Sequence, residues 1–257
     1  MTSFSWCPLA GFVYIKTSIG GKGYGHLICI KPEAGLSGEQ RACLKKGDNS
    51  HVLEAADLGC ERGGRSLFRG LSFTLSGGEL LRIAGPNGSG KTSLLRILCG
   101  LLSPTAGEVR WRGSPAQSLK EEYARQLVYL GHAPAVKDDL TAAENLSIAC
   151  SLAGLPASEA AVREALERYG LPGTDQPVRK LSQGQRRRAA LARLLLCEAL
   201  PLWLLDEPFA ALDAAAVEFT RGLMRGHVAR GAAVVYTTHQ EDGLQESRVV
   251  DLGAAAA

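Results

Sequence analysis

The sequence predicts an α/β fold with a mainly parallel sheet, and three observations lead to this prediction. Short apolar runs alternate with helical patterns from about residue 51 onward, as in parallel strands joined by crossover helices. A glycine-rich loop at residues 85–92 stands between an apolar run and a leucine-rich helical pattern. A second apolar run, residues 202–205, ends in the acidic pair Asp206 and Glu207. We therefore expect one large α/β domain.

Composition and charge narrow the class of protein. The 257 residues are 46% apolar, 21% charged and 6% aromatic, which is typical of a soluble globular domain. The net charge of +3, from 29 basic and 26 acidic residues, lacks the one-sided basic character of nucleic-acid-binding domains. The seven cysteines contain no Cys-x-x-Cys pair, which indicates thiols in a reducing compartment. We expect no nucleic-acid partner.

Membrane-spanning and leader segments are not predicted. No apolar run approaches the roughly 18 residues that a spanning helix requires. The longest, residues 196–205, is too short and contains Pro201. The N-terminus has no basic flank followed by an apolar core and a cleavage site, so we read no secretory signal. Any membrane association is expected to be peripheral.

Residues 1–50 differ in composition from the rest of the chain. They are rich in Gly, Ser and Lys and show no sustained helical or strand period. Two alternatives stay open for this N-terminal extension: it is poorly ordered, or it is an artefact of the assigned start. The main domain is expected at 51–257, with a helical insert at about 140–185.

The first half of the main domain is expected to be rich in strands. Residues 52–58 and 71–75 are predicted as short strands, and 79–85 as a buried strand that leads into the glycine loop. A helix over 92–102 is expected to end at the proline and glycine that follow. A further strand is predicted at 126–131.

The second half alternates helices and strands. Helices at 141–154 and 157–170 form the predicted insert, and Ser158 is expected to cap the second of them. The remaining predicted elements are a helix at about 185–198, a strand at 202–206, a helix over 214–230 and a strand at 232–239.

The glycine-rich loop carries phosphate-binding chemistry. Its eight residues match the P-loop pattern in the required place between a strand and a helix: Gly85, Pro86, Asn87, Gly88, Ser89, Gly90, Lys91 and Thr92. Glycines let backbone N–H groups converge on phosphates, and the helix N-terminus adds partial positive charge. Lys91 is expected to reach the β- and γ-phosphates, and the Thr92 hydroxyl to bind Mg²⁺.

The acidic pair supplies the complementary half of such a site. Asp206, at the end of a buried strand, can hold Mg²⁺ directly or through water. Glu207 is placed to accept a proton from an attacking water. After a P-loop, this pair predicts nucleotide hydrolysis with Glu207 and Lys91 as catalytic residues.

Residues 181–185, Leu-Ser-Gln-Gly-Gln, precede a predicted helix. They resemble the Leu-Ser-Gly-Gly-Gln signature of ATP-binding cassette (ABC) ATPases, with Gln183 in place of a glycine. The resemblance implies that Ser182, Gly184 and Gln185 contact the γ-phosphate of ATP bound by a second subunit, in a head-to-tail homodimer. It also implies a P-loop NTPase fold with a mainly parallel sheet, an antiparallel β subdomain and a helical subdomain.

Further positions follow the order of this family. Asp213 resembles the D-loop residue that crosses the dimer interface, and His239 the switch histidine that contacts the γ-phosphate. Two positions depart from the pattern. His132 stands where the family has its Q-loop glutamine, a Mg²⁺ ligand that reports to the transport partner. Arg62 replaces the aromatic residue that stacks on adenine, where a guanidinium could cover the base.

The run Arg186, Arg187 and Arg188 follows the signature. One interpretation of such a run is a contact with nucleic acid. We favour a solvated helix face or a contact with a membrane partner.

The departures also indicate a subfamily. The stretches CERGGRSLF, YLGH, LSQGQRRRAALARLLL and TTHQ resemble the ATP-binding subunits of haem-exporter or cytochrome c maturation transporters, over about residues 52–257. The resemblance implies ATP and Mg²⁺ as cofactors and a CcmB-type transmembrane subunit, with two ATPase and two membrane subunits. It further implies peripheral attachment to the cytoplasmic face of a bacterial inner membrane, with haem export or release of a haem chaperone.

No direct haem binding is expected of the ATPase itself. An ABC transporter for another substrate, or a soluble ABC ATPase, remains the alternative.

Overall fold

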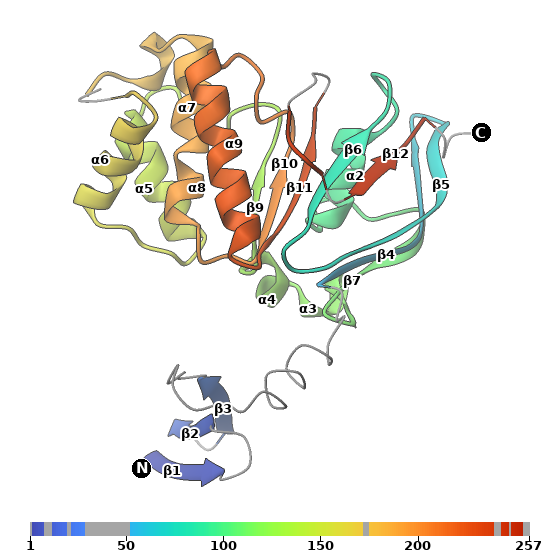
Figure 1. Ribbon diagram of the computed structural model, residues 1–257, viewed down its shortest axis with the longest axis vertical. Coiled ribbons are helices and arrows are strands. Elements are labelled where there is room, and N and C mark those ends of the chain that lie inside the picture. The colour runs from blue at the N-terminus through green and yellow to red at the C-terminus, as the bar shows by residue number, and fades with distance from the viewer. Residues whose placement is uncertain are drawn as a thin grey trace. The chain divides into compact units, whose positions relative to one another are not determined.

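The computed structural model describes residues 52–171, 175–238, 243–246 and 248–253 with their side chains, and the backbone of residues 2–7, 12–19 and 22–28. The chain divides into two compact units, Met1–Asn49 and Ser50–Ala257 (Figure 1).

The first unit contains an antiparallel sheet. Its strands are β1 (Thr2–Cys7), β2 (Phe12–Ile19) and β3 (Lys22–Ile28), in the order β1-β2-β3. These strands were not expected from the sequence. They form where β-branched and aromatic residues gather, as in Phe12–Ile19, and such residues favour the extended backbone.

The second unit is built around a parallel sheet of five strands in the order β12-β6-β11-β10-β9. The strands are β6 (Leu80–Ala84), β9 (Leu127–Leu130), β10 (Leu202–Leu205), β11 (Ala233–Thr237) and β12 (Arg248–Asp251). Every residue of β10 and β11 is buried, as expected for central strands covered on both faces. The mainly parallel α/β fold predicted from the sequence is thus confirmed.

A second, antiparallel sheet has the order β5-β4-β7-β8. Its strands are β4 (Leu53–Arg62), β5 (Arg65–Leu75), β7 (Ala106–Trp111) and β8 (Ser114–Pro115). Gly63 and Gly64 connect β4 to β5, both with positive φ, as the tightest hairpin turns require. The two strands are longer than the sequence predicts, and their hairpin pairs Arg62 with Arg65.

Helix α2 (Lys91–Leu98) joins the two sheets. Its buried leucines belong to one hydrophobic core with Leu53 and Trp111 of the antiparallel sheet and Leu81 and Ile83 of the parallel sheet. Apolar burial on this scale fixes the helix, and with it the loop that precedes it. The short helices α3 (Ala116–Leu119) and α4 (Glu121–Ala124) lead from β8 to β9.

The remaining helices of the described residues all follow β9 in the chain. They are α5 (Ala142–Leu152), α6 (Glu159–Arg168), the 3₁₀ helix η1 (Val178–Lys180), α7 (Gln183–Leu191), α8 (Arg193–Leu196) and α9 (Ala214–Ala229). Figure 1 shows α5 and α6 at one end of this unit and the β4–β5 hairpin at the other. Ser158 caps α6 as predicted, since its Oγ accepts from Ala161 N at 3.2 Å.

The predicted helix at 185–198 is two helices, α7 and α8, which meet at Ala192. Among the residues described, we find no helix with the length and apolar character needed to cross a bilayer.

Candidate nucleotide-binding and hydrolysis site

The P-loop runs from the end of β6 to the start of α2. Gly90 is the N-cap of α2 with a φ of 102°, a left-handed conformation that glycine adopts without steric cost. A Cβ on Gly90 would lie 3.1 Å from Leu67 Cβ and 3.2 Å from the ring of Phe68. Glycine therefore lets the loop pack closely against β5 while it turns into the helix.

Lys91 is held inside this loop. The residue is 7% exposed, and Nζ donates to Gly85 O at 2.8 Å and to Pro86 O at 3.0 Å. Burial lowers the pKa of Lys91, and the charges of Glu207 and Asp206 act in the opposite direction. The two carbonyl oxygens are neutral partners, so a phosphate oxygen would be a stronger acceptor for the same ammonium group.

Asp206 joins three elements through its two carboxylate oxygens. Thr92 Oγ1, on α2, donates to Oδ2 at 2.8 Å, and Thr237 Oγ1, at the end of β11, donates to Oδ1 at 2.8 Å. Asp206 itself follows β10 and is 1% exposed. The Thr92 hydroxyl and the Asp206 carboxylate offer adjacent oxygen ligands of the kind that Mg²⁺ prefers.

Glu207 has an unusual backbone conformation. Its φ is 51°, a left-handed value that is uncommon outside glycine. Glu207 N donates to Thr237 Oγ1 at 2.9 Å, and Glu207 O accepts from Ala210 N at 3.1 Å. Backbone strain of this kind persists only where several contacts fix the residue, and it occurs often at functional sites.

These residues meet at one open pocket of about 560 Å³. Its lining includes Asn87, Gly88, Gly90, Lys91, Thr92, His132, Asp206 and Glu207. Ser89 Oγ, in the same loop, is buried without a hydrogen-bond partner among the described residues. A buried hydroxyl of this kind requires a partner, and a phosphate oxygen would supply one. The pocket thus fits a nucleotide phosphate chain with Mg²⁺.

The signature residues lie outside this pocket. Ser182 caps α7: its Oγ accepts from Gln185 N at 3.2 Å, and Gln185 Oε1 accepts from Ser182 N at 2.8 Å. Asp213 likewise caps α9, accepting from Ala216 N at 2.8 Å. Of the described residues that line the pocket, none belongs to the signature, and Asp213 and Arg62 are not among them either.

Gly184 makes a close contact within the signature helix. A Cβ at this position would lie 2.7 Å from Ala211 O, in the segment between Glu207 and α9. The start of α7 is therefore packed directly against the backbone that carries Asp213.

Of the two histidines expected at the site, His132 is among the described residues and His239 is not. His132 is exposed, follows β9 by two residues and lines the same pocket as Glu207. His239, the expected switch residue, lies outside the described residues, although β11 before it is described to its end at Thr237.

The arginine run corrects one expectation from the sequence. Arg187 is 3% exposed and is no part of a solvated helix face. Its Nη1 donates to Gly131 O at 2.8 Å and to His132 O at 3.2 Å. Its Nη2 donates to Asp206 O and to Glu207 O, both at 2.7 Å. Successive helical residues point about 100° apart, so a signal for this burial was available: three consecutive residues cannot share one face.

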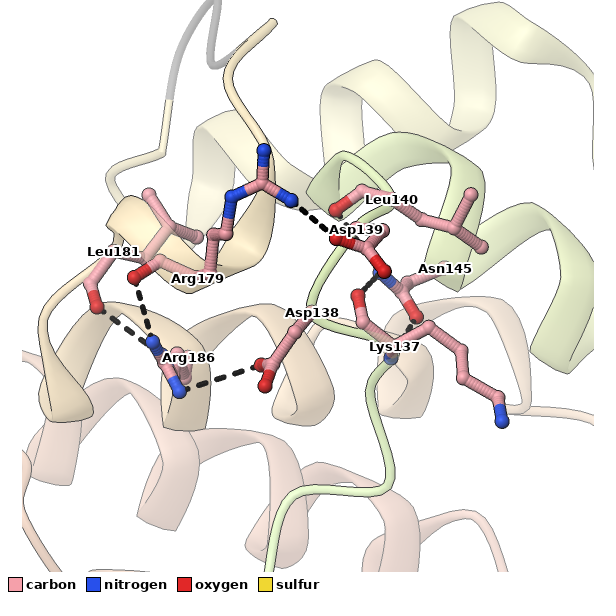
Figure 2. A network of polar contacts seen from close by, with 8 residues as sticks. All are labelled: Lys137, Asp138, Asp139, Leu140, Asn145, Arg179, Leu181 and Arg186. Atoms are coloured by element: carbon pink, nitrogen blue, oxygen red, sulfur yellow. Dashed lines mark hydrogen bonds and ion pairs between the residues drawn. The ribbon is translucent and has the colours of Figure 1, made fainter.

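Arg186 and Arg188 are half-buried and have other partners. Figure 2 shows Arg186 between the carbonyl groups that precede α7 and the carboxylate of Asp138. Arg186 Nη2 donates to Arg179 O at 2.8 Å and Nε to Leu181 O at 3.1 Å. Arg188 Nη1 lies 3.4 Å from Tyr169 O.

The loop before α5 contacts the segment that precedes α7. Arg179 pairs with Asp139, and Asn145 bonds to Lys137 through both ends of its amide, with Nδ2 to Lys137 O at 3.0 Å (Figure 2). The backbone joins the same segments, because Arg179 N donates to Asp138 O at 3.0 Å. The loop after His132 is thus attached to the segment that leads into the signature.

The fold and this site define the ATPase cassette of an ABC transporter. The ABC transporter family model matches residues 68–210. A curated relative from Aromatoleum aromaticum, the cytochrome c biogenesis ATP-binding export protein CcmA, is 54% identical over 80% of this chain and 97% of that protein. Relatives of the same name from Dechloromonas aromatica and Pseudomonas aeruginosa are 51% and 48% identical, over 78% and 79% of this chain and 98% and 100% of their own lengths.

The chain belongs to the CcmA family of ABC transporter ATP-binding proteins. It is accordingly an ATPase subunit of an ABC transport system.

Solved structures show the same fold. A putative ABC transporter ATP-binding protein from Pyrococcus furiosus aligns with a TM-score of 0.69 at 23% identity, over 80% of this chain and 99% of that one. An ATP-binding cassette in a dimeric post-hydrolysis state, bound to ADP and Pi, aligns with a TM-score of 0.68 at 24% identity, over 78% and 95%.

Proposed function

We propose that this chain hydrolyses ATP to drive a transporter of c-type cytochrome biogenesis, which exports haem or releases a haem-loaded chaperone. The family supports this assignment, since relatives named for cytochrome c biogenesis match over nearly their whole length. The observation that carries the catalytic part is the pocket at which the P-loop, Asp206 and Glu207 meet.

The residues of the pocket have separate tasks in this proposal. Thr92 and Asp206 would hold Mg²⁺, with His132 as a further ligand, and the charge of the ion would offset that of the phosphates. Lys91 leaves the loop carbonyls for the β- and γ-phosphates. Glu207 accepts the proton of the attacking water, and His239 contacts the γ-phosphate. Catalysis here depends on positioning and charge stabilisation.

The residues outside the pocket act on a second copy of the chain. In a head-to-tail homodimer, Ser182, Gly184 and Gln185 contact the γ-phosphate held by the partner. Asp213 lies at the interface between the two copies. Arg62, exposed at the end of β4, covers the adenine base with its guanidinium plane.

A CcmB-type transmembrane subunit is the proposed partner, with two copies of each subunit at the cytoplasmic face of a bacterial inner membrane. A small pocket close to His132 in sequence supports this, because it lies among β9, α5, α7 and α8 and its lining includes the apolar residues Pro134, Val136, Leu146 and Ala149. Movement of the nucleotide site would reach the membrane subunit there. Neither haem nor nucleic acid binds the ATPase directly in this proposal.

The test is a chromosomal Lys91→Ala substitution in a bacterium without a second maturation system. We expect loss of c-type cytochromes that stain for covalent haem, with the apoproteins still made, because Lys91 is required for phosphate binding. Lys120→Ala, an exposed lysine away from the P-loop, is the matched control. Normal haem staining in the Lys91→Ala strain would refute the assignment to cytochrome c biogenesis and leave the ATPase assignment intact.

A further inference from the structure

Arg187 connects the signature helix to the catalytic edge of the sheet. It lies in the first turns of α7, yet its guanidinium donates to carbonyl oxygens at the ends of two strands. Gly131 O and His132 O follow β9, and Asp206 O and Glu207 O follow β10, all within 3.2 Å of the guanidinium nitrogens. One side chain thus holds both the Q-loop position and the acidic pair.

Only arginine has the shape for these four contacts. The guanidinium is planar and presents Nη1 and Nη2 in a fixed fork, and each of them here serves one strand end. A lysine ammonium is a single point and cannot span both pairs of carbonyl groups. The remaining N–H, on Nε, has no partner among the described residues. The contacts of this buried cation are therefore concentrated on the two strand ends.

The contact with Glu207 falls on a strained residue. With a φ of 51°, Glu207 needs its backbone to be fixed on both sides. Thr237 Oγ1 accepts from the amide at 2.9 Å, and Arg187 Nη2 donates to the carbonyl at 2.7 Å. The direction of the Glu207 Cα–Cβ bond follows from this backbone conformation, and the bond from Arg187 is one of the contacts that fix it, beside that from Ala210 N.

We propose that Arg187 is a positioning residue for hydrolysis, which sets the orientation of Glu207 and His132 according to the place of the signature helix. A shift of α7 would reach both residues through one rigid group. The proposal rests on the catalytic role proposed above for Glu207.

The neighbouring arginines show that this link is specific to one position. Arg186 bonds to the segment before α7 and to Asp138, and Arg188 to Tyr169 O. Neither is bonded to the carbonyl groups of residues 131, 132, 206 or 207 in any hydrogen bond found in the described part of the chain. Arg188 therefore offers a control of the same chemistry on the same helix.

The experiment compares Arg187→Lys and Arg187→Gln with Arg188→Gln in the full chain together with its membrane partner. For both Arg187 variants we expect kcat for ATP hydrolysis to fall about 10-fold to 100-fold, since small misplacements of catalytic groups cost rate on this scale. KM for ATP should change by less than about three-fold, because the P-loop contacts remain. Arg188→Gln should keep kcat within about two-fold, because its bond does not reach the site.

A second measurement separates positioning from folding. Added guanidinium ion, at millimolar concentration, should restore part of the lost kcat in an Arg187→Ala variant and leave Arg188→Ala unchanged. An Arg187→Lys protein with normal kcat would overturn the proposal. An Arg187→Lys protein that has lost its fold or its affinity for ATP would also overturn the proposal, because Arg187 would then be a purely structural residue. If Glu207→Gln keeps its activity, the role of Glu207 is wrong, whatever the Arg187 variants show.

Discussion

Asp206 shows how much of the site depends on single side chains. Its carboxylate is almost fully buried and accepts hydrogen bonds from Thr92 and Thr237, and its backbone oxygen accepts from Arg187. A buried carboxylate is costly unless such donors compensate it. The same donors hold the carboxylate beside the P-loop. The hydrogen bonds that compensate its burial therefore also place it where the proposed Mg²⁺ would bind.

His227 is a buried group outside the nucleotide site, and its titration affects stability. Its ring stacks on Trp203 at a centroid distance of 3.6 Å, and its side chain is fully buried. Burial lowers the pKa of His227 to about 4, and the charge of Arg230 acts in the same direction. The unfolded chain takes up a proton near pH 6.5 that the folded chain does not accept until about pH 4.

Stability should therefore fall as the pH decreases from about 6.5 towards 4. The expected loss is about 1.4 kcal/mol per pH unit in this window, and none is expected above it. Urea unfolding of the wild type and of His227→Phe at pH 7.5 and pH 5 measures the effect. His227→Phe keeps a ring for the stack and cannot titrate, so its stability should fall by less. Equal losses in the two proteins would contradict the assignment.

Among the elements, the starts of α7 and α9 are capped by residues for which an interface role is proposed. Ser182 and Asp213, which the family resemblance places at a dimer interface, are also the N-caps of α7 and α9. A cap contributes about 1 kcal/mol to stability, so substitutions at these positions change the fold as well as the site. Variants at either residue have to be compared by activity per folded molecule.

Gly184 and Gly222 form a matched pair for testing the contact between α7 and the segment before α9. An added Cβ at Gly184 would lie 2.7 Å from Ala211 O, whereas one at Gly222 would meet no atom within 4 Å. We expect Gly184→Ala to displace the Ala211 segment, with a loss of about 1–3 kcal/mol in stability and a fall in ATPase rate.

Gly222→Ala, on an exposed turn of α9, should stabilise the helix by about 0.5–1 kcal/mol and leave the rate unchanged. Thermal unfolding and steady-state ATPase assays check both variants. A Gly184→Ala protein as stable and active as Gly222→Ala would show that the contact is not required.

The sequence predicts most elements of the second unit because their patterns are local. The strand at Leu80–Ala84, helix α2 and the cap Ser158 follow from apolar runs, glycines and capping residues. The strands Ala106–Trp111 and Arg248–Asp251 were missed. In Ala106–Trp111, polar residues interrupt the run, and Arg248–Asp251 is four residues long and pairs with the distant β6. The pairing of a short strand with a distant segment produces no pattern in the neighbouring sequence.

At the scale of the whole molecule, motif order predicts which residues share a pocket. One pocket is lined by residues from three distant parts of the sequence, because the ends of parallel strands meet at one edge of the sheet: Lys91 and Thr92, His132, and Asp206 and Glu207. Their roles stay predictions. Helix geometry predicts that three consecutive arginines cannot all face solvent, but the sequence does not show that Arg187 is the buried one, since that depends on where α7 lies against β9 and β10.

Two copies of the chain should be needed for turnover, and Glu207→Gln tests this. We expect hydrolysis to fall by at least about 100-fold, because the proton acceptor is lost, with ATP binding retained. The bound ATP should then hold the protein as a dimer, visible by light scattering as a mass of two chains. Glu198→Gln, at an exposed carboxylate paired with Arg230, is the control. A Glu207→Gln protein that turns over normally, or stays monomeric with saturating ATP, would contradict this prediction.

The position of Ser182 outside the pocket has a consequence for how the ATPase depends on its own concentration. If each pocket is completed by the signature of another copy, an isolated chain is an enzyme that lacks one part of its site. In dilute solution the rate would then rise with the square of the protein concentration, and it would become linear once most chains are paired. Two cassettes held on one membrane assembly are already at high local concentration, so there the reaction would be first order from the start.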